Sequence, residues 1–211
     1  KPEFFIKDIP PKAGKKSLVG KVPDVTVPQI YYGENSANYV IVNSKEAEFD
    51  FPATDSNISQ RAEYRYDGNG GVQFSSVIRR LAYAWEFADI NILISGAVTS
   101  DSSIQYHRLV QDRVKQITPF LLLDSDPYMV VAEGKLWWIQ DAYTTTTNYP
   151  YSDPSGNEFN YIRNSVKAVI DAYTGEVNFY IYDEEDTLIQ TYAKVFPNLF
   201  KPREEMPAVL Q

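Results

Sequence analysis

The stretch YMVVAEGKLWWIQDAYTT, residues 128–145, decides which fold the sequence predicts. Two apolar runs of strand length, residues 128–132 and 135–145, lie on either side of the dipeptide Glu133-Gly134. A short glycine-containing turn between two such runs predicts a β-hairpin, because glycine tolerates the backbone angles that tight hairpin turns require.

A second hairpin is predicted further along the chain. Residues 164–173 and 176–183 read as strands, with a turn at Thr174-Gly175 between them. In the second of these runs, aliphatic and phenylalanine side chains alternate with polar or tyrosine side chains, which is typical of a strand with one face in the core. Val177, Phe179 and Ile181 are predicted on one side of this strand, and Asn178, Tyr180 and Tyr182 on the other.

Helical periodicity predicts a first helix that starts at Ser75 or Ser76, either of which can cap its N-terminus. We expect this helix to continue through residues 90–94. Side chains three or four residues apart form one apolar stripe, consisting of Ile78, Leu81, Ala82, Trp85 and Ala88.

Two further helices follow from the same periodicity. One is expected to start at Ser102 or Ser103 and to stop at Pro119, because proline cannot continue a helix. The other covers residues 188–196, after an acidic run that suits a helix N-terminus. An additional helix is expected from Arg203.

The predicted fold is α+β, an antiparallel sheet of two consecutive β-hairpins packed against amphipathic helices. Five of the 13 prolines fall in residues 1–28, which predicts an extended arm or linker there. Residues 29–211 are expected to form a single α+β domain, truncated at its C-terminal end. Short strands are expected at residues 39–42 and 46–51, with a loop over residues 52–71.

Composition excludes several classes of chemistry. The 211 residues contain no Cys and one His, which removes disulfides, thiol catalysis and multi-histidine metal sites. The 20 Lys and Arg against 28 Asp and Glu give a net charge of −8, which argues against nucleic-acid binding. We therefore expect no cofactor, no metal and no nucleic-acid partner. No apolar run approaches the ~20 residues needed to cross a bilayer.

Acidic residues leave catalysis open, because paired carboxylates can hydrolyse glycosides. The Asp124-Ser125-Asp126-Pro127 segment could present two carboxylates on one face, but a turn is the preferred interpretation. The candidates by type are Glu86, Asp89, Asp124, Asp126, Asp141 and Asp171. His107, predicted on the second helix, is either a base or a hydrogen-bonded boundary histidine.

An aromatic cluster is the more unusual feature of the sequence. Trp137 and Trp138 are adjacent, so on a strand they must point to opposite faces of the sheet. The cluster is either a platform for sugar rings or part of a sheet that is covered on both faces. The candidate ligand-binding residues are Trp138, Asp141, Tyr143, Tyr149 and Tyr151.

Six strings of residues carry a family resemblance. The strings cover residues 79–84, 118–121, 126–128, 138–145, 149–152 and 161–168, of which WIQDAYTT at 138–145 and YIRNSVKA at 161–168 are the longest, with eight residues each. With them, the chain resembles the uncharacterised protein family 0182, large bacterial membrane proteins, over roughly residues 64–207. The resemblance implies several transmembrane helices followed by a large extracytoplasmic region, of which this chain would be part. It implies no activity, cofactor or catalytic residue.

The expected function is therefore that of a non-catalytic extracytoplasmic domain of a bacterial integral membrane protein. It would bind a cell-envelope component, either a polysaccharide or a protein, and would reach the cell membrane through a transmembrane region outside this chain. A carboxylate-based hydrolase acting on envelope polysaccharide and a purely structural assembly module are the alternatives.

Overall fold

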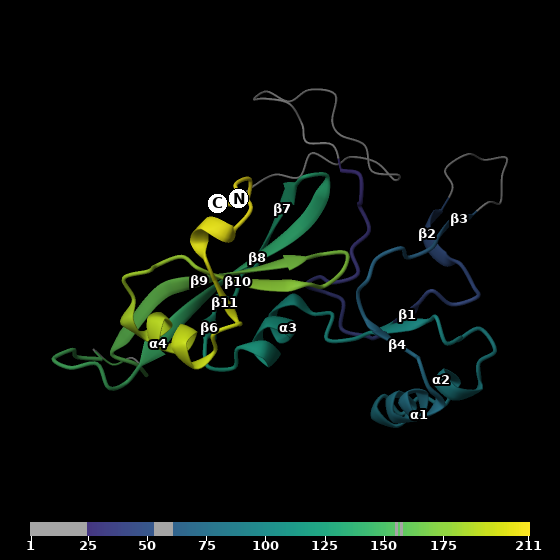
Figure 1. The fold of residues 1–211 in the computed structure, drawn as a ribbon, viewed down its shortest axis with the longest axis horizontal. Helices are drawn as coiled ribbons and strands as arrows, with labels where there is room; N and C mark the ends of the chain where they lie inside the picture. Colours follow the sequence, from purple (N-terminus) through teal and green to yellow (C-terminus); the bar gives the residue numbers. More distant parts are fainter. Residues whose placement is uncertain (1–24, 53–60, 155, 157) are drawn as a thin grey trace. The chain divides into compact units, whose positions relative to one another are not determined.

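A computed structural model describes residues 25–52, 61–154, 156 and 158–211 (Figure 1). The chain divides into two compact units. Among the described residues, unit 1 comprises Ala37–Arg108, and unit 2 comprises residues 25–36 and Leu109–Gln211. Residues 1–24 of the predicted arm lie outside the described residues. The predicted boundaries, 1–28 and 29–211, stay predictions.

Unit 2 is built on a six-stranded sheet with the order β11-β10-β9-β8-β6, and β7 also pairs with β8. All these pairs are antiparallel except β10 with β11, which is parallel. Both predicted hairpins are present, β7–β8 and β9–β10, which confirms the α+β prediction. The strands are β6 (Leu122–Leu123), β7 (Tyr128–Ala132), β8 (Lys135–Thr146), β9 (Tyr161–Asp171), β10 (Val177–Ile181) and β11 (Phe200–Pro202).

The turn of the β7–β8 hairpin follows from its two residues. Glu133 and Gly134 both have positive φ angles, 53° and 75°. Two consecutive positive φ angles define the turn type whose twist matches that of two paired strands. The carbonyl of Gly134 also accepts hydrogen bonds from the amides of Thr26 and Val27, at 2.8 and 3.1 Å. These two hydrogen bonds hold the segment around Thr26 and Val27 against the sheet.

Both faces of this sheet are covered. On one face, β8, β9 and β10 pack against α3 (Val110–Ile117) and α4 (Thr187–Val195). On the other face, the residues after the short 3-10 helix η1 (Arg203–Glu205) contribute Met206 and Leu210 to a second core. Trp138 lies in the first core and Trp137 packs against the second, as their opposite orientations require.

Helix α4 begins within one residue of its predicted start, because Asp186 caps it by accepting a hydrogen bond from the amide of Leu188 at 2.9 Å. The helix predicted from Arg203 is wrong, since only the three residues of η1 are helical there. Pro202 and Pro207 flank this stretch, and proline restricts both itself and the residue before it.

Unit 1 contains a three-stranded antiparallel sheet with the order β1-β5-β4 and a separate β2–β3 pair. Its elements are β1 (Val40–Val42), β2 (Glu48–Pro52), β3 (Arg61–Tyr64), β4 (Val72–Gln73), α1 (Val77–Glu86), α2 (Asn91–Ile94) and β5 (Ser103–Gln105). The strands predicted at residues 39–42 and 46–51 are confirmed as β1 and β2. The loop predicted over residues 52–71 is wrong where β3 lies.

The start predicted for the second helix is wrong. The helix begins at Val110, while residues 103–105 form the central strand β5. Ile104 is fully buried between β1 and β4, and the hydroxyl of Ser102 donates to the carbonyl of Asn43 at 2.9 Å. Because β5 pairs with a strand on each side, its backbone N–H and C=O groups find hydrogen-bond partners in the sheet. These contacts outweigh the helical periodicity of the local sequence.

Helix α1 starts where the sequence places it, because the side chain of Ser76 accepts from the amide of Arg79 at 3.2 Å. Its predicted continuation through residues 90–94 is wrong. Ala88 has a φ of 50°, which ends the helix, and α2 begins separately after it. The predicted apolar stripe is largely exposed, and the opposite side of α1 faces the core of unit 1.

Gly175→Ala should destabilise unit 2, because Gly175 has a φ of 74° and lies against the ring of Tyr32. A Cβ atom there would come within 2.4–2.6 Å of three ring atoms. Arg113 holds the ring in place, with its guanidinium carbon 4.6 Å from the ring centroid. We expect the free energy of unfolding to fall by about 2–4 kcal/mol, as measured by urea denaturation. Gly96→Ala is the control, since nothing lies within 4 Å there; equal stability of the two variants would contradict the prediction.

Candidate functional site

Of the five candidate binding residues, Trp138 belongs to the core of unit 2. Its side chain is 7 % exposed, and its indole N–H donates to the carbonyl of Tyr32 at 2.9 Å. A buried ring with a satisfied N–H has no open face for a ligand. Its position thus favours the alternative in which the sheet is covered on both faces.

Asp141 lies on the other side of the sheet, opposite Lys167 in the register of β8 and β9. The Lys167 ammonium donates to the Asp141 carboxylate at 2.5 Å and lies 4.8 Å from the ring centroid of Tyr182. Burial lowers the pKa of Lys167, but its hydrogen bond to Asp141 outweighs this effect and the pKa lies above its ordinary value. The pair is therefore an ion pair between partly buried groups.

Tyr143 and Asp124 form a second polar pair. The Tyr143 hydroxyl donates to one carboxylate oxygen of Asp124 at 2.8 Å, and the amide of Asp126 donates to the other at 3.0 Å. These two bonds, the amide first, hold the pKa of Asp124 below its ordinary value. The Asp124 side chain thus closes a turn onto its own backbone, which confirms the turn interpretation of residues 124–127.

Tyr149 and Tyr151 lie on the loop between β8 and β9, and Asn160 holds this loop in shape. The Asn160 side chain accepts from the amide of Tyr149 and donates to the carbonyls of Tyr149 and Ser152, all at 2.9–3.0 Å. The ring of Tyr149 stacks on that of Tyr161 with centroids 4.4 Å apart, and Tyr149 stays 40 % exposed. Tyr151 is fully exposed and has a φ of 59°.

One group of polar residues was missed by sequence reasoning. Asp186 is fully buried, and its carboxylate accepts from the hydroxyls of Thr144 and Ser165 at 2.5 Å and of Tyr161 at 2.7 Å. Burial raises the pKa of Asp186, but the hydrogen bonds outweigh it and hold the pKa below its ordinary value. An aspartate before a helix was the only local signal, because the hydroxyls come from distant strands.

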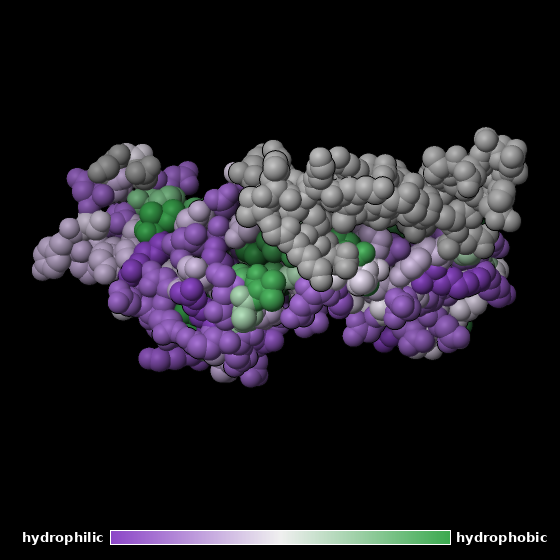
Figure 2. Space-filling model, turned by 90° about the horizontal axis from the view of Figure 1, so that it is seen from above, coloured by the Kyte–Doolittle hydropathy of each residue, from purple (hydrophilic) through white to green (hydrophobic). Residues whose placement is uncertain are grey.

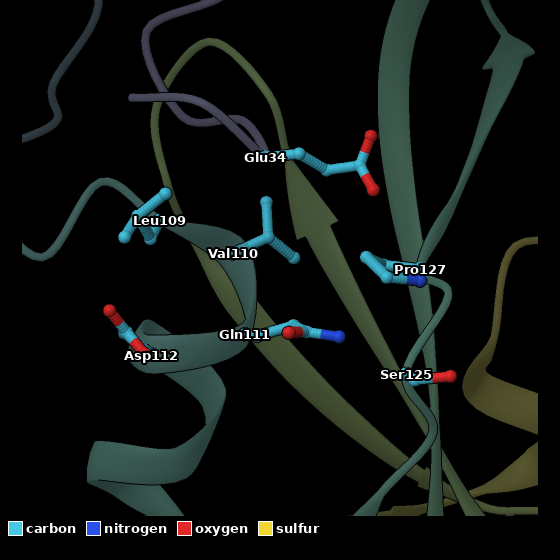
Figure 3. A pocket seen from close by; sticks show the side chains of 7 residues that line it. All are labelled: Glu34, Leu109, Val110, Gln111, Asp112, Ser125 and Pro127. Atoms are coloured by element: carbon cyan, nitrogen blue, oxygen red, sulfur yellow. The ribbon is translucent and has the colours of Figure 1, made fainter. Parts of the chain in front are cut away.

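Two hollows in unit 2 are lined by other residues. One, of about 200 Å³, lies at the N-terminus of α3, where the side chain of Glu34 extends toward Pro127 (Figure 3). The other is wider and lined mainly by acidic groups. The linings are Glu34, Leu109, Val110, Gln111, Asp112, Ser125 and Pro127 for the first, and Asn164, Tyr182, Asp183, Glu184, Glu185, Arg203 and Glu204 for the second. None of the five candidate binding residues lines either hollow.

The candidate acids are dispersed. Glu86 and Asp89 belong to unit 1, whereas Asp171 in unit 2 accepts from the amides of Tyr173 and Thr174 at 2.8 and 3.0 Å. His107 is exposed with a φ of 48° and follows β5, so its predicted place on a helix is wrong. In the described part of the chain, no three His, Asp or Glu side chains are placed to hold a metal ion.

Among the coloured residues in Figure 2, hydrophilic ones prevail and apolar ones gather in a few patches. Over residues 25–52, 61–154 and 158–211, no helix combines the length and hydrophobicity that crossing a bilayer demands.

The fold and the paired polar groups define an α+β protein built around a mixed six-stranded sheet. The chain belongs to the uncharacterised protein family UPF0182, whose family model matches residues 1–211. This confirms the resemblance found in the sequence. No solved structure matches the chain.

Three curated relatives that resemble the chain each carry the name UPF0182 protein. The chain is 48 % identical to the protein of Pelotomaculum thermopropionicum over 210 residues and 49 % identical to that of Moorella thermoacetica over 210 residues. It is 48 % identical to the protein of Methanospirillum hungatei over 212 residues. These alignments cover 98–100 % of this chain and 22 % of each relative, so the chain spans about a fifth of their length.

Proposed function

We propose that this chain is a non-catalytic, extracytoplasmic binding module of an integral membrane protein, and that it binds a cell-envelope polysaccharide through the β8–β9 loop. The observation that carries the proposal is the pair of exposed tyrosines, Tyr149 and Tyr151, on a loop held by Asn160. Exposed aromatic rings offer flat apolar faces on which the C–H groups of a sugar ring can pack.

The part of the loop that contains the two tyrosines favours binding, because hydrogen bonds from Asn160 already hold Tyr149 and Ser152 in place. Asn160 makes three hydrogen bonds to the loop backbone, and the Ser152 hydroxyl donates to the carbonyl of Asn160 at 2.6 Å. Tyr149 is supported on one face by Tyr161, which leaves the other face for a ligand. A surface that is already held in place loses little conformational entropy on binding.

The pairing of the carboxylates favours binding over hydrolysis. Asp141 is neutralised by Lys167, and Asp124 is bonded to Tyr143 and to its own turn. A glycoside hydrolase needs a carboxylic acid whose pKa is raised so that it can donate a proton, and the pKa of Asp124 is lowered.

The double variant Tyr149→Ala/Tyr151→Ala tests the proposal in the full-length protein. We expect its affinity for insoluble envelope polysaccharide from the source organism to fall about tenfold, since each ring supplies about 0.5–1.5 kcal/mol. Co-sedimentation measures this. The control is Thr147→Ala, which changes an exposed residue of the same loop and should bind as the unmodified protein does. Unchanged binding by the double variant, or retention by a protein partner and by no polysaccharide, would overturn the assignment.

A further inference from the structure

Helix α1 exposes four large apolar side chains, which we call the α1 face. Val77, Ile78, Leu81 and Trp85 are 75 %, 80 %, 55 % and 87 % exposed. Residues 77, 81 and 85 are four apart, so they stand in a row on one side of the helix, with Ile78 beside them. Single exposed apolar side chains are common, but a contiguous group that includes tryptophan is typical of a contact surface.

The α1 face cannot turn inward, because the other side of the helix is already packed. Tyr83, Ala84 and Phe87 face the core of unit 1, and the rings of Tyr83 and Phe74 meet edge to face with centroids 6.0 Å apart. The helix is thus apolar on two sides, a pattern expected of a helix that lies between two surfaces.

Hydrogen bonds fix the rotation of α1 as well. The Arg80 guanidinium donates to the carbonyl of Ile92 at 2.7 and 3.1 Å and to that of Leu93 at 3.0 Å, which fastens α1 to α2. The two helices lie side by side in unit 1 (Figure 1). Because the hydrogen bonds of Arg80 and the packing of the opposite side fix the orientation of α1, the α1 face points away from the core of unit 1.

Charge argues against an anionic lipid surface as the occupant. The helix carries Arg79, Arg80 and Glu86, but Arg80 is committed to α2 and Arg79 donates to the carbonyl of Gln73 at 3.0 Å. Helices that bind anionic bilayers carry a surplus of free Lys and Arg beside their apolar face. The α1 face has no such surplus, so its charge does not favour an anionic bilayer as the partner.

Size argues against a second copy of the chain. A stable dimer buries ~800 Å² and about 20–30 residues on each partner, which is far more than four side chains of one short helix provide. A surface this small is sufficient only when its partner is tethered, because the tether supplies a high effective concentration.

We propose that in the full-length protein the α1 face is covered by a segment of the same polypeptide that lies outside these 211 residues. The chain matches its relatives along 98–100 % of its own length but spans 22 % of theirs, so more than three quarters of each relative is available as a tethered neighbour. The α1 face is then an internal docking surface that joins unit 1 to the rest of the protein. This proposal is independent of the tyrosine loop, which belongs to unit 2.

Photo-crosslinking in the full-length protein identifies the occupant. Benzoylphenylalanine is placed at position 78 or 85, the protein is irradiated in its membrane, and crosslinked peptides are mapped by mass spectrometry. We expect intramolecular crosslinks to peptides outside residues 1–211, at least fivefold above those from the control position 86 on the polar side of α1. Crosslinks to other residues within 1–211, lipid adducts, crosslinked dimers, or yields equal to the control would overturn the proposal.

A charge substitution gives a second readout. We expect Ile78→Asp to lower the Tm of the full-length protein by about 5 °C or more, because it would bury an unpaired carboxylate. Glu86→Gln, on the polar side of the same helix, should leave the Tm unchanged. An unchanged Tm for Ile78→Asp would show that the α1 face is open. Polysaccharide binding by the tyrosine loop can succeed or fail without altering either result.

Discussion

Asp186→Ala is expected to lower the free energy of unfolding by about 3–5 kcal/mol, because it removes one acceptor from three hydroxyls and one helix cap. The hydroxyls of Thr144, Ser165 and Tyr161 all donate to this carboxylate. Thr144 and Ser165 are fully buried, so water cannot replace the lost acceptor without opening the structure. Urea denaturation followed by circular dichroism measures the loss.

Asp186→Asn separates charge from shape. The amide keeps an oxygen for the Leu188 amide but places an NH₂ group among hydroxyl donors, so we expect a loss smaller than that of alanine. A loss below about 1 kcal/mol for Asp186→Ala would contradict the assignment of Asp186 as a central stabilising group.

The charge of Asp186 also predicts a pH dependence. The folded chain holds the pKa of Asp186 below its ordinary value of 3.8, so the unfolded chain takes up the proton first as the pH falls. The resulting stabilisation is complete above that ordinary value and is lost as the pH falls through the folded-state pKa. Between about pH 6 and about pH 3, the unmodified protein should therefore lose more stability than Asp186→Asn.

Trp138→Ala is expected to cost about 3–5 kcal/mol, the usual loss when a buried tryptophan is truncated to alanine. The ring packs between α3 and the sheet, and its N–H bond to Tyr32 holds the segment before residue 36. Equilibrium unfolding in urea measures the change.

Trp138→Phe is the matched control, since it keeps an aromatic ring and removes the hydrogen bond. We expect a loss of about 1–3 kcal/mol for this variant, from the unpaired carbonyl of Tyr32 and the smaller ring. If Trp138→Ala weakened polysaccharide binding while the unfolding free energy stayed the same, the residue would be a binding residue after all.

Local sequence predicted the elements whose formation depends on neighbouring residues. The β7–β8 hairpin is found within one residue of its predicted bounds, because Gly134 and the two runs beside it contain what a tight turn needs. The start of α4 follows in the same way from Asp186. Helix α1 begins at Ser76 for the same local reason.

Identical short strings show where local information ends. Asp-Ala-Tyr-Thr occurs at residues 141–144, inside β8, and again at 171–174, where it ends β9 and turns. The second copy precedes Gly175, whose positive φ completes the turn, whereas the first copy continues as a strand paired with β9. Neighbouring residues and pairing partners, rather than the four residues, select the conformation.

The sequence predicted which residue types gather in the candidate site, but it did not predict which of them are exposed, buried or paired. Tyr149 and Tyr151 are exposed, yet Trp138 from the same cluster is in the core and Asp141 is paired with Lys167. Register between β8 and β9 decides these partners, and the paired residues of the two strands are 15–34 positions apart in the sequence.

By itself, the sequence determined the α+β class, both hairpins, the starts of α1 and α4 and the family, because each of these depends on short-range patterns or on similarity along the chain. Only the tertiary structure decided which side of α1 is buried, that residues 103–105 form a strand, and that Asp186 gathers three hydroxyls. A helix with two apolar sides satisfies its own periodicity in either orientation, so only the packing of Tyr83, Ala84 and Phe87 on unit 1 leaves the α1 face open.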